Sequence, residues 1–230
     1  MDPAAQAPVA DRAHPCARAF LLVFAALGVT LVARYHITPF IARFLVPLFP
    51  STDPKGLSLF LRHLLTFSLP TAVVCLLAWA WMARWELLPQ PWPSLTLGAA
   101  PLRTLTHGLA GGALIAGVTV VCVYVSQHGL HWQPNGWGIA GNCFSNFYEE
   151  VEYRGFITEA GLAAFRKARW AILLGAAAFG LSHGTLGGGR MMLATLVGVL
   201  LGFVYYRTRS LWAPWIVHQV ADVVADSLLG

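Results

Sequence analysis

The sequence contains few charged residues and few cysteines. Asp, Glu, Lys and Arg together make up 11% of its 230 residues, whereas about 25% is usual in a soluble domain. The four cysteines form no CxxC pair and no Cys/His spacing, which argues against a zinc cage and against a disulfide framework. The net charge of +5 comes from basic residues spread through short loops, a pattern that does not predict nucleic-acid binding.

Hydrophobic residues make up 57% of the chain, in long runs that short polar or proline-rich stretches separate. We therefore predict an all-α fold, a polytopic transmembrane helical bundle of about seven to eight membrane helices. Residues 1–16, rich in Ala and Pro, are expected to form a disordered tail. Membrane helices and interfacial segments are expected at 17–106, and a helical core at 107–230.

In the N-terminal half, the apolar run at 17–33 is predicted to be a membrane helix, because no A-x-A-like cleavage site of a signal peptide follows it. Residues 36–50 contain three prolines and Arg43, and this short length favours an interfacial or re-entrant segment over a span. A second span is expected at 64–83, with a kink at Pro70. The proline-rich stretch at 85–101 is expected to run along the membrane surface.

The C-terminal half contains the other predicted spans. A glycine-rich span at 107–126 is expected to pack closely on a neighbour, and further spans are expected at 170–186, 190–206 and 211–229. The segment at 137–163 contains a cluster of charges and should be surrounded by the other helices. With seven spans, nine Lys and Arg residues lie on one side and five on the other, with Arg154 inside. The positive-inside rule then places the N-terminus in the cytoplasm.

The charged cluster is Phe147-Tyr-Glu-Glu-Val-Glu-Tyr-Arg-Gly-Phe156. At membrane depth each ionisable group costs roughly 2.5–3.5 kcal/mol unless it finds a partner. Four such groups together cost on the order of 10 kcal/mol on the same scale. We expect a fold to keep such a cluster only if the groups pair with one another and have a function.

Helical spacing divides this cluster into two parts. Residues four apart share a helix face, so one polar stripe consists of Asn142, Asn146, Glu150 and Arg154. Glu150 and Arg154 are predicted to form a structural ion pair. Glu149 lies on the neighbouring face without a cation on its own helix, which suits a general base. An interhelical salt-bridge network is the alternative, and Glu152 has no explanation from spacing.

Two further helices supply histidines. Phe179-Gly-Leu-Ser-His183 lies toward the end of one predicted span. His218 and Asp222 are four residues apart in the last span, on one face. A single histidine in a membrane helix is often only hydrogen-bonded packing. Two histidines on separate helices, together with an unpaired glutamate, indicate a site.

In this order, Glu149-Glu150-x-x-x-Arg154, Phe179-x-x-x-His183 and His218-x-x-x-Asp222 resemble the CPBP family. Its members are the type II CAAX prenyl proteases and their bacterial relatives, also called ABI-domain or glutamic-type intramembrane proteases. The resemblance extends over about residues 107–230 and implies that this core is catalytic.

The resemblance also implies a role for each motif residue. Glu149 activates the attacking water with help from His183, and Glu150 and Arg154 form the structural pair. His218 and residue 222 stabilise the oxyanion. The prenyl proteases have Asn where this chain has Asp222, and an ionised Asp repels an oxyanion. We therefore expect Asp222 to orient His218.

The function predicted from these observations is an intramembrane endopeptidase whose substrate is a membrane-anchored protein or peptide. Such a substrate is a C-terminal sorting tail, a bacteriocin leader or another membrane peptide, and the composition favours a bacterial inner membrane. No metal is expected, because there is no HExxH, although Glu/His/His is a possible zinc ligand set. The alternatives are a proton- or ion-coupled transporter and a non-catalytic membrane scaffold or immunity protein. The sequence does not indicate the oligomeric state.

Overall fold

The computed structural model describes residues 15–48 and 56–229, and every regular element within them is helical. The predicted all-α fold is thereby confirmed for the described residues. Of the predicted tail at 1–16, residues 1–14 lie outside this part, and the first helix begins at Pro15. The elements are α1 (Pro15–Val32), η2 (Ala33–Ile37), α2 (Thr38–Leu45), η3 (Val46–Leu48), α3 (Leu57–His63), η4 (Leu64–Ser68), α4 (Leu69–Arg84), η5 (Trp92–Leu95), α5 (Pro101–Gln127), α6 (Gly136–Glu149), η6 (Glu150–Thr158), α7 (Glu159–Phe165), α8 (Ala168–Ser182), η7 (Gly184–Leu186), α9 (Gly188–Thr208) and α10 (Trp212–Leu229).

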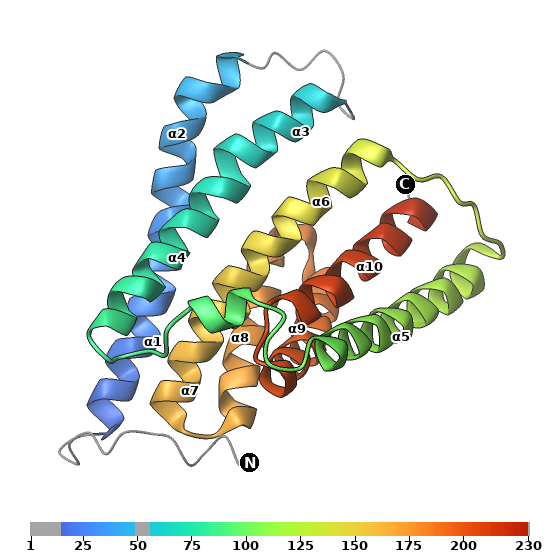
Figure 1. Ribbon diagram of the computed structural model, residues 1–230. Coiled ribbons are helices and arrows are strands. Elements are labelled where there is room, and N and C mark those ends of the chain that lie inside the picture. The colour runs from blue at the N-terminus through green and yellow to red at the C-terminus, as the bar shows by residue number, and fades with distance from the viewer. Residues whose placement is uncertain (1–14, 49–55, 230) are drawn as a thin grey trace.

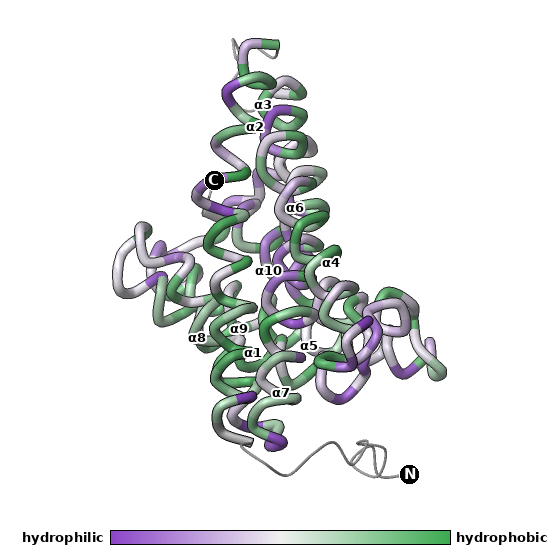
Figure 2. The backbone as a smooth tube through the Cα atoms, turned by 90° about the vertical axis from the view of Figure 1, so that its left-hand side faces the viewer, coloured by the Kyte–Doolittle hydropathy of each residue, from purple (hydrophilic) through white to green (hydrophobic). Residues whose placement is uncertain are grey.

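Four helices are long and apolar enough to cross a membrane: Ala17–Leu48, Leu57–Arg84, Pro101–Gln127 and Gly188–Thr208. Figure 2 shows hydrophobic residues along much of α1, α8 and α9, while hydrophilic residues gather near the ends and around α10. This distribution is that of an integral membrane protein. The count of seven to eight membrane helices stays a prediction.

The prediction that residues 36–50 form a separate interfacial or re-entrant segment is wrong for the described residues up to 48. They continue the first helix, because a π turn at η2 precedes Pro39. The Thr38 hydroxyl donates to the Ala33 carbonyl at 2.9 Å. This local widening accommodates the proline, whose missing N–H would otherwise break the ladder.

The second long helix uses the same device. Its π segment η4 ends two residues before Pro70, so Pro39 and Pro70 each follow a π turn. The two helices run antiparallel in Figure 1, and the hydroxyl oxygens of Thr38 and Thr71 lie 3.3 Å apart between them. The hairpin is therefore joined near its proline sites.

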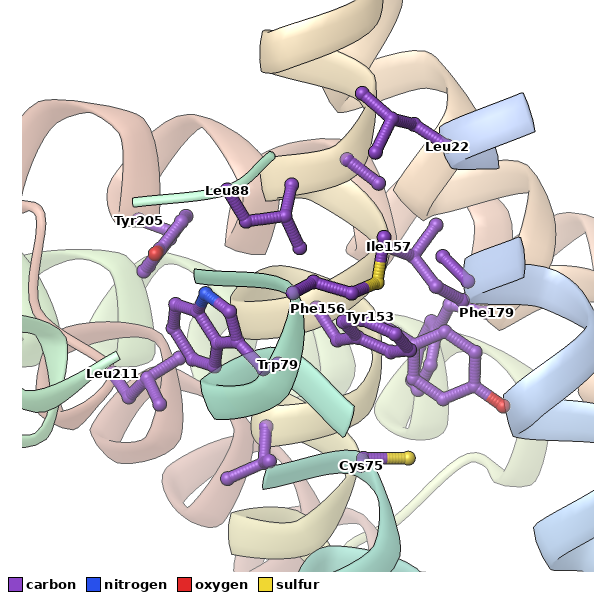
Figure 3. Packing of buried hydrophobic residues seen from close by; sticks show 14 residues of the cluster. Leu22, Cys75, Trp79, Leu88, Tyr153, Phe156, Ile157, Phe179, Tyr205 and Leu211 are labelled. Atoms are coloured by element: carbon purple, nitrogen blue, oxygen red, sulfur yellow. The ribbon is translucent and has the colours of Figure 1, made fainter. Parts of the chain in front are cut away.

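The charged segment α6–η6–α7 is one continuous helix in the middle of the bundle. Every residue from Glu150 to Gly161 is buried, so the prediction that other helices surround 137–163 is confirmed for this stretch. Figure 3 shows the apolar core around it, with Trp79 and Phe156 among its members. A Cβ on Gly155 would lie 2.6 Å from the Trp79 ring, so this close approach requires glycine.

The glycine-rich helix α5 packs on α10, as its composition predicts. A Cβ on Gly108, Gly111 or Gly112 would meet side chains of α10 at 2.8–3.0 Å. Gly117 instead has nothing within 4 Å. Three glycines on one face thus let α5 and α10 approach closely, and Figure 1 shows the two helices side by side.

Polar contacts join α7 and the loop after α4 to the ends of α9 and α10. Glu159 accepts from the Tyr205 hydroxyl at 2.8 Å and pairs with Arg209 at 2.8 Å. In the same region the Leu211 N–H donates to the Ser94 carbonyl at 2.8 Å. These contacts hold one end of the bundle together, away from the histidines.

Candidate active site

The ion pair that the spacing predicts is present. The α-helix α6 ends at Glu149, and the π segment η6 begins at Glu150. Arg154 Nη1 lies 3.3 Å from Glu150 Oε1, and the two side chains are 1% and 0% exposed. This pair partly neutralises two buried charges, as a low-dielectric interior requires.

Glu150 has a second partner that sequence reasoning missed. His218 Nδ1 lies 2.8 Å from Glu150 Oε1, the oxygen that also accepts from Arg154. An ionised carboxylate only accepts hydrogen bonds, so Nδ1 is the protonated nitrogen of this contact. Glu150 therefore orients the His218 ring, and Nε2 is left to face the other acids.

Glu149 lies next to His218 but makes no short ion pair. Its Oε2 is 3.8 Å from His218 Nε2, and its Oε1 accepts from the Tyr148 hydroxyl at 3.2 Å. The Glu149 side chain is 14% exposed, whereas Glu150 is fully buried. Of the three glutamates at 149, 150 and 152, Glu149 is thus the one that solvent reaches.

His183 lies at the end of α8, where its Nδ1 is 2.9 Å from the Phe179 carbonyl. The Phe179 ring contacts both histidines edge to face, at 4.7 Å from His183 and 5.5 Å from His218. Arg154 lies over the same ring at 4.5 Å. No hydrogen bond or ion pair joins His183 to Glu149, both of which the structure describes. Phe179 therefore contacts both rings.

Asp222 is the most exposed acid beside His218. Its Oδ2 is 3.8 Å from His218 Nε2, and its side chain is 36% exposed. One turn away, Asp226 accepts from Asn142 at 2.7 Å, and Gln219 accepts from Asn146 at 3.2 Å. These bonds join α10 to α6 and set how the acids of the two helices face each other.

A cavity of about 890 Å³ opens beside this group of residues. His183, His218 and Asp222 line one part of it. Apolar side chains of α5 and α9 form another wall, among them Ile115 and Leu196. Glu149 is not one of the lining residues, but its Oε2 lies 3.8 Å from His218 Nε2. The site therefore combines an apolar wall with a polar end.

Glu152, which spacing did not explain, has a partner from the first helix. Arg34 Nη2 lies 3.6 Å from Glu152 Oε2, and Glu152 is fully buried. Arg34 is 118 residues away in the chain, so no local pattern points to this contact. The hairpin α1–α4 thereby supplies a charge to the segment that contains Glu149.

The acids and histidines of the site are also candidate ligands for a metal ion. Among the described residues, no group of three His, Cys, Asp or Glu side chains is placed to hold an ion. That the reaction needs no metal stays a prediction.

Fold and site together define an integral membrane protein with a buried carboxylate–histidine centre beside a cavity. Residues 131–224 match the family model described as type II CAAX prenyl endopeptidase Rce1-like. This match confirms, for that part of the chain, the resemblance to the CPBP family. The matched part is shorter than the predicted 107–230 and begins after α5. Searches of curated proteins and of solved structures returned no match.

Proposed function

We propose that the protein is a glutamic-type intramembrane endopeptidase that hydrolyses a peptide bond in a membrane-associated protein or peptide. The observation on which this rests is the contrast among three neighbouring acids. Glu150 and Glu152 are fully buried and face arginines, while Glu149 is partly exposed, accepts a hydrogen bond from Tyr148 and lies 3.8 Å from His218. The family match supports the same reaction class.

In this mechanism Glu149 accepts a proton from a water that attacks the scissile carbonyl. His218 presents Nε2 to the same space, since Glu150 holds its other nitrogen. A protonated Nε2 donates to the oxyanion of the tetrahedral intermediate. His183 lines the cavity from the opposite side of Phe179, where it reaches the substrate or the leaving group.

The apolar wall of the cavity suits a substrate segment that is itself apolar. Leu114 of α5 and Leu196 of α9 line the cavity and are 59% and 62% exposed. Both are therefore open to lipid as well as to the cavity. We propose that a membrane-embedded segment lies between α5 and α9, with its scissile bond at the polar end.

The orientation follows from where the basic residues lie, if the bundle crosses the membrane seven times. The loop 128–135, the start of α6 and the end of α10 lie together at the top of Figure 1. Gln133, Asn135 and Asp226 from these parts line the cavity. The opposite end has eight basic residues among the described ones, and the cavity end has three. The eight are Arg18, Arg84, Arg103, Arg166, Lys167, Arg169, Arg207 and Arg209, and the three are Arg43, Arg62 and Arg190.

By the positive-inside rule the end with eight basic residues is cytoplasmic. The cavity then opens on the non-cytoplasmic side. The substrate we propose is therefore a peptide segment that has already been translocated or exported, as a sorting tail or a leader peptide would be, in a bacterial inner membrane.

The central experiment compares the wild type with Glu149→Gln on membrane peptides, with product masses as the readout. We expect Glu149→Gln to lower kcat by about 10³-fold or more, because the general base is lost while the shape is kept. The masses also identify the scissile bond. Cleavage at the wild-type rate by Glu149→Gln would disprove the mechanism.

Two controls separate this function from its alternatives. Activity that persists in chelator supports a metal-free reaction, whereas one bound zinc per chain that disappears in His183→Ala would contradict it. Proton-dependent uptake by proteoliposomes without any cleavage would favour the transporter. A scaffold or immunity protein would show neither activity.

A further inference from the structure

The proposed chemistry does not use Glu152, although burying this carboxylate is costly. Its side chain is fully buried, and neither carboxylate oxygen has a hydrogen-bond partner within the described chain. A buried charge without a partner is strongly unfavourable. A cation or a hydrogen-bond donor must therefore offset the cost of burying the Glu152 carboxylate.

Arg34 is the cation that faces it. Its guanidinium is 3.6 Å from Glu152 Oε2 and lies over the Phe67 ring at 5.5 Å and the Tyr153 ring at 5.9 Å. The Arg34 side chain is 14% exposed. Aromatic faces on two sides hold the guanidinium in the bundle, so the side chain does not extend toward an interface.

The distance and the free polar atoms indicate water between the two groups. At 3.6 Å the contact is too long for a direct hydrogen bond. Arg34 Nε and the Thr30 hydroxyl, one turn away on α1, also have no hydrogen-bond partner among the residues that the structure describes. Buried polar atoms without a partner, such as these two and both oxygens of Glu152, are what ordered water bridges in protein interiors.

We propose that Arg34 and Glu152 form a buried, water-bridged ion pair that joins the first helix to the π segment and acts as a positioning pair for Glu149. Glu152 is three residues after Glu149, at the start of η6. Anchoring it to η2 of the first helix restrains the rotation of the turn on which Glu149 lies. Arg34 lies outside the matched residues 131–224. In this proposal the N-terminal hairpin therefore contributes a positioning residue to the active site. The positioning role rests on the proposed function.

A double-mutant cycle tests the pair with four proteins: the wild type, Arg34→Gln, Glu152→Gln and the double variant. Each single variant leaves one buried charge alone, and we expect kcat to fall by about tenfold or more with KM changed by less than about twofold. The double variant removes both charges and should return kcat to within about threefold of the wild type. If the fold-decreases in kcat of the two single variants instead multiply in the double variant, the two residues act independently. That result would overturn the pair.

Arg43→Gln is the matched control, because Arg43 is exposed on the same continuous helix and should leave kcat unchanged. Arg34→Lys keeps the charge without the planar guanidinium and should have a kcat between those of the wild type and Arg34→Gln. If Arg34→Gln does not fold, a double variant that folds supports the pair. A double variant that also fails to fold overturns it.

Thermal unfolding of the same four proteins in detergent separates this proposal from the proposed function. Coupling between the two substitutions in the unfolding midpoint supports the ion pair even if the wild type cleaves no peptide, in which case only the endopeptidase function fails. Additive midpoints would overturn the pair whatever the activity. Coupled midpoints with an unchanged kcat in Arg34→Gln would overturn the positioning role.

Discussion

His218 contacts three carboxylates, and the shortest contact determines how its ring is oriented. The hydrogen bond from Nδ1 to Glu150 is 2.8 Å, whereas Asp222 stands 3.8 Å from Nε2. The sequence hypothesis gives Asp222 the orienting role. The geometry favours Glu150 for it, with Asp222 as a partly exposed acid at the cavity edge.

Asp222→Asn should therefore be tolerated. Asp222 is one-third exposed and stands 3.8 Å from His218, and ion pairs of exposed groups contribute about 0.2–1 kcal/mol, so we expect kcat to stay within about fivefold of the wild type. His218→Phe, which removes the donor, should lower kcat by about 10²-fold or more. Peptide cleavage under identical conditions compares the two. If Asp222→Asn lowers kcat as much as His218→Phe does, Asp222 rather than Glu150 has the orienting role.

At the scale of elements, the π segment η6 determines how α6 and α7 meet their neighbours. It lies against Trp79 of α4, and only a hydrogen at position 155 leaves room for that ring. This contact joins the N-terminal hairpin to the helix of the acids. The Gly155–Trp79 packing and the Arg34–Glu152 contact thus both fix the N-terminal hairpin against this helix, the first through apolar contact and the second through charge.

Gly155→Ala should destabilise the protein by about 1–3 kcal/mol, because the buried Trp79 ring has no room to move. For a chain of this size the unfolding midpoint should fall by about 2–4 °C for each kcal/mol. The matched control is Gly117→Ala in α5, which meets nothing within 4 Å. It should leave stability unchanged or raise it by up to about 1 kcal/mol. Equal effects of the two substitutions would contradict the packing argument.

The helices α5 and α9 form the apolar wall of the cavity, and their side chains should determine substrate affinity. Ile115→Phe places a larger side chain in the cavity and should raise KM by roughly threefold or more, with a smaller effect on kcat. Leu109→Phe, an exposed position on the same helix that does not line the cavity, is the control. A KM that changes equally in both variants would show that the wall does not receive the substrate.

For the whole molecule, the side on which the cavity opens is testable without a substrate. In a chain whose four native cysteines are replaced by serine, His131→Cys lies in the loop at the cavity end and Lys167→Cys at the basic end, and both positions are exposed. An impermeant maleimide should label His131→Cys in intact cells and Lys167→Cys only after permeabilisation. The reverse pattern would place the cavity on the cytoplasmic side.

Much of the local structure was predictable because it depends on residues close together in the chain. Apolar runs indicate membrane helices, and helical spacing places Glu150 beside Arg154 and His218 on the same face as Asp222. The segment at 36–50 was predicted wrongly for its described residues up to 48, because a short stretch with three prolines favours a segment separate from the first helix. The π turn before Pro39 and the Thr38 hydroxyl let the helix continue past the proline.

The sequence alone was sufficient for the all-helical class, the membrane environment, the ion pair of Glu150 with Arg154 and the family resemblance. Three contacts required the folded chain: Glu150 with His218, Phe179 between the two histidines, and Arg34 with Glu152. Each joins residues on different helices, and Arg34 and Glu152 are 118 positions apart. Periodicity shows which face of a helix is polar, but which other helix meets that face depends on how the apolar surfaces of the whole bundle pack.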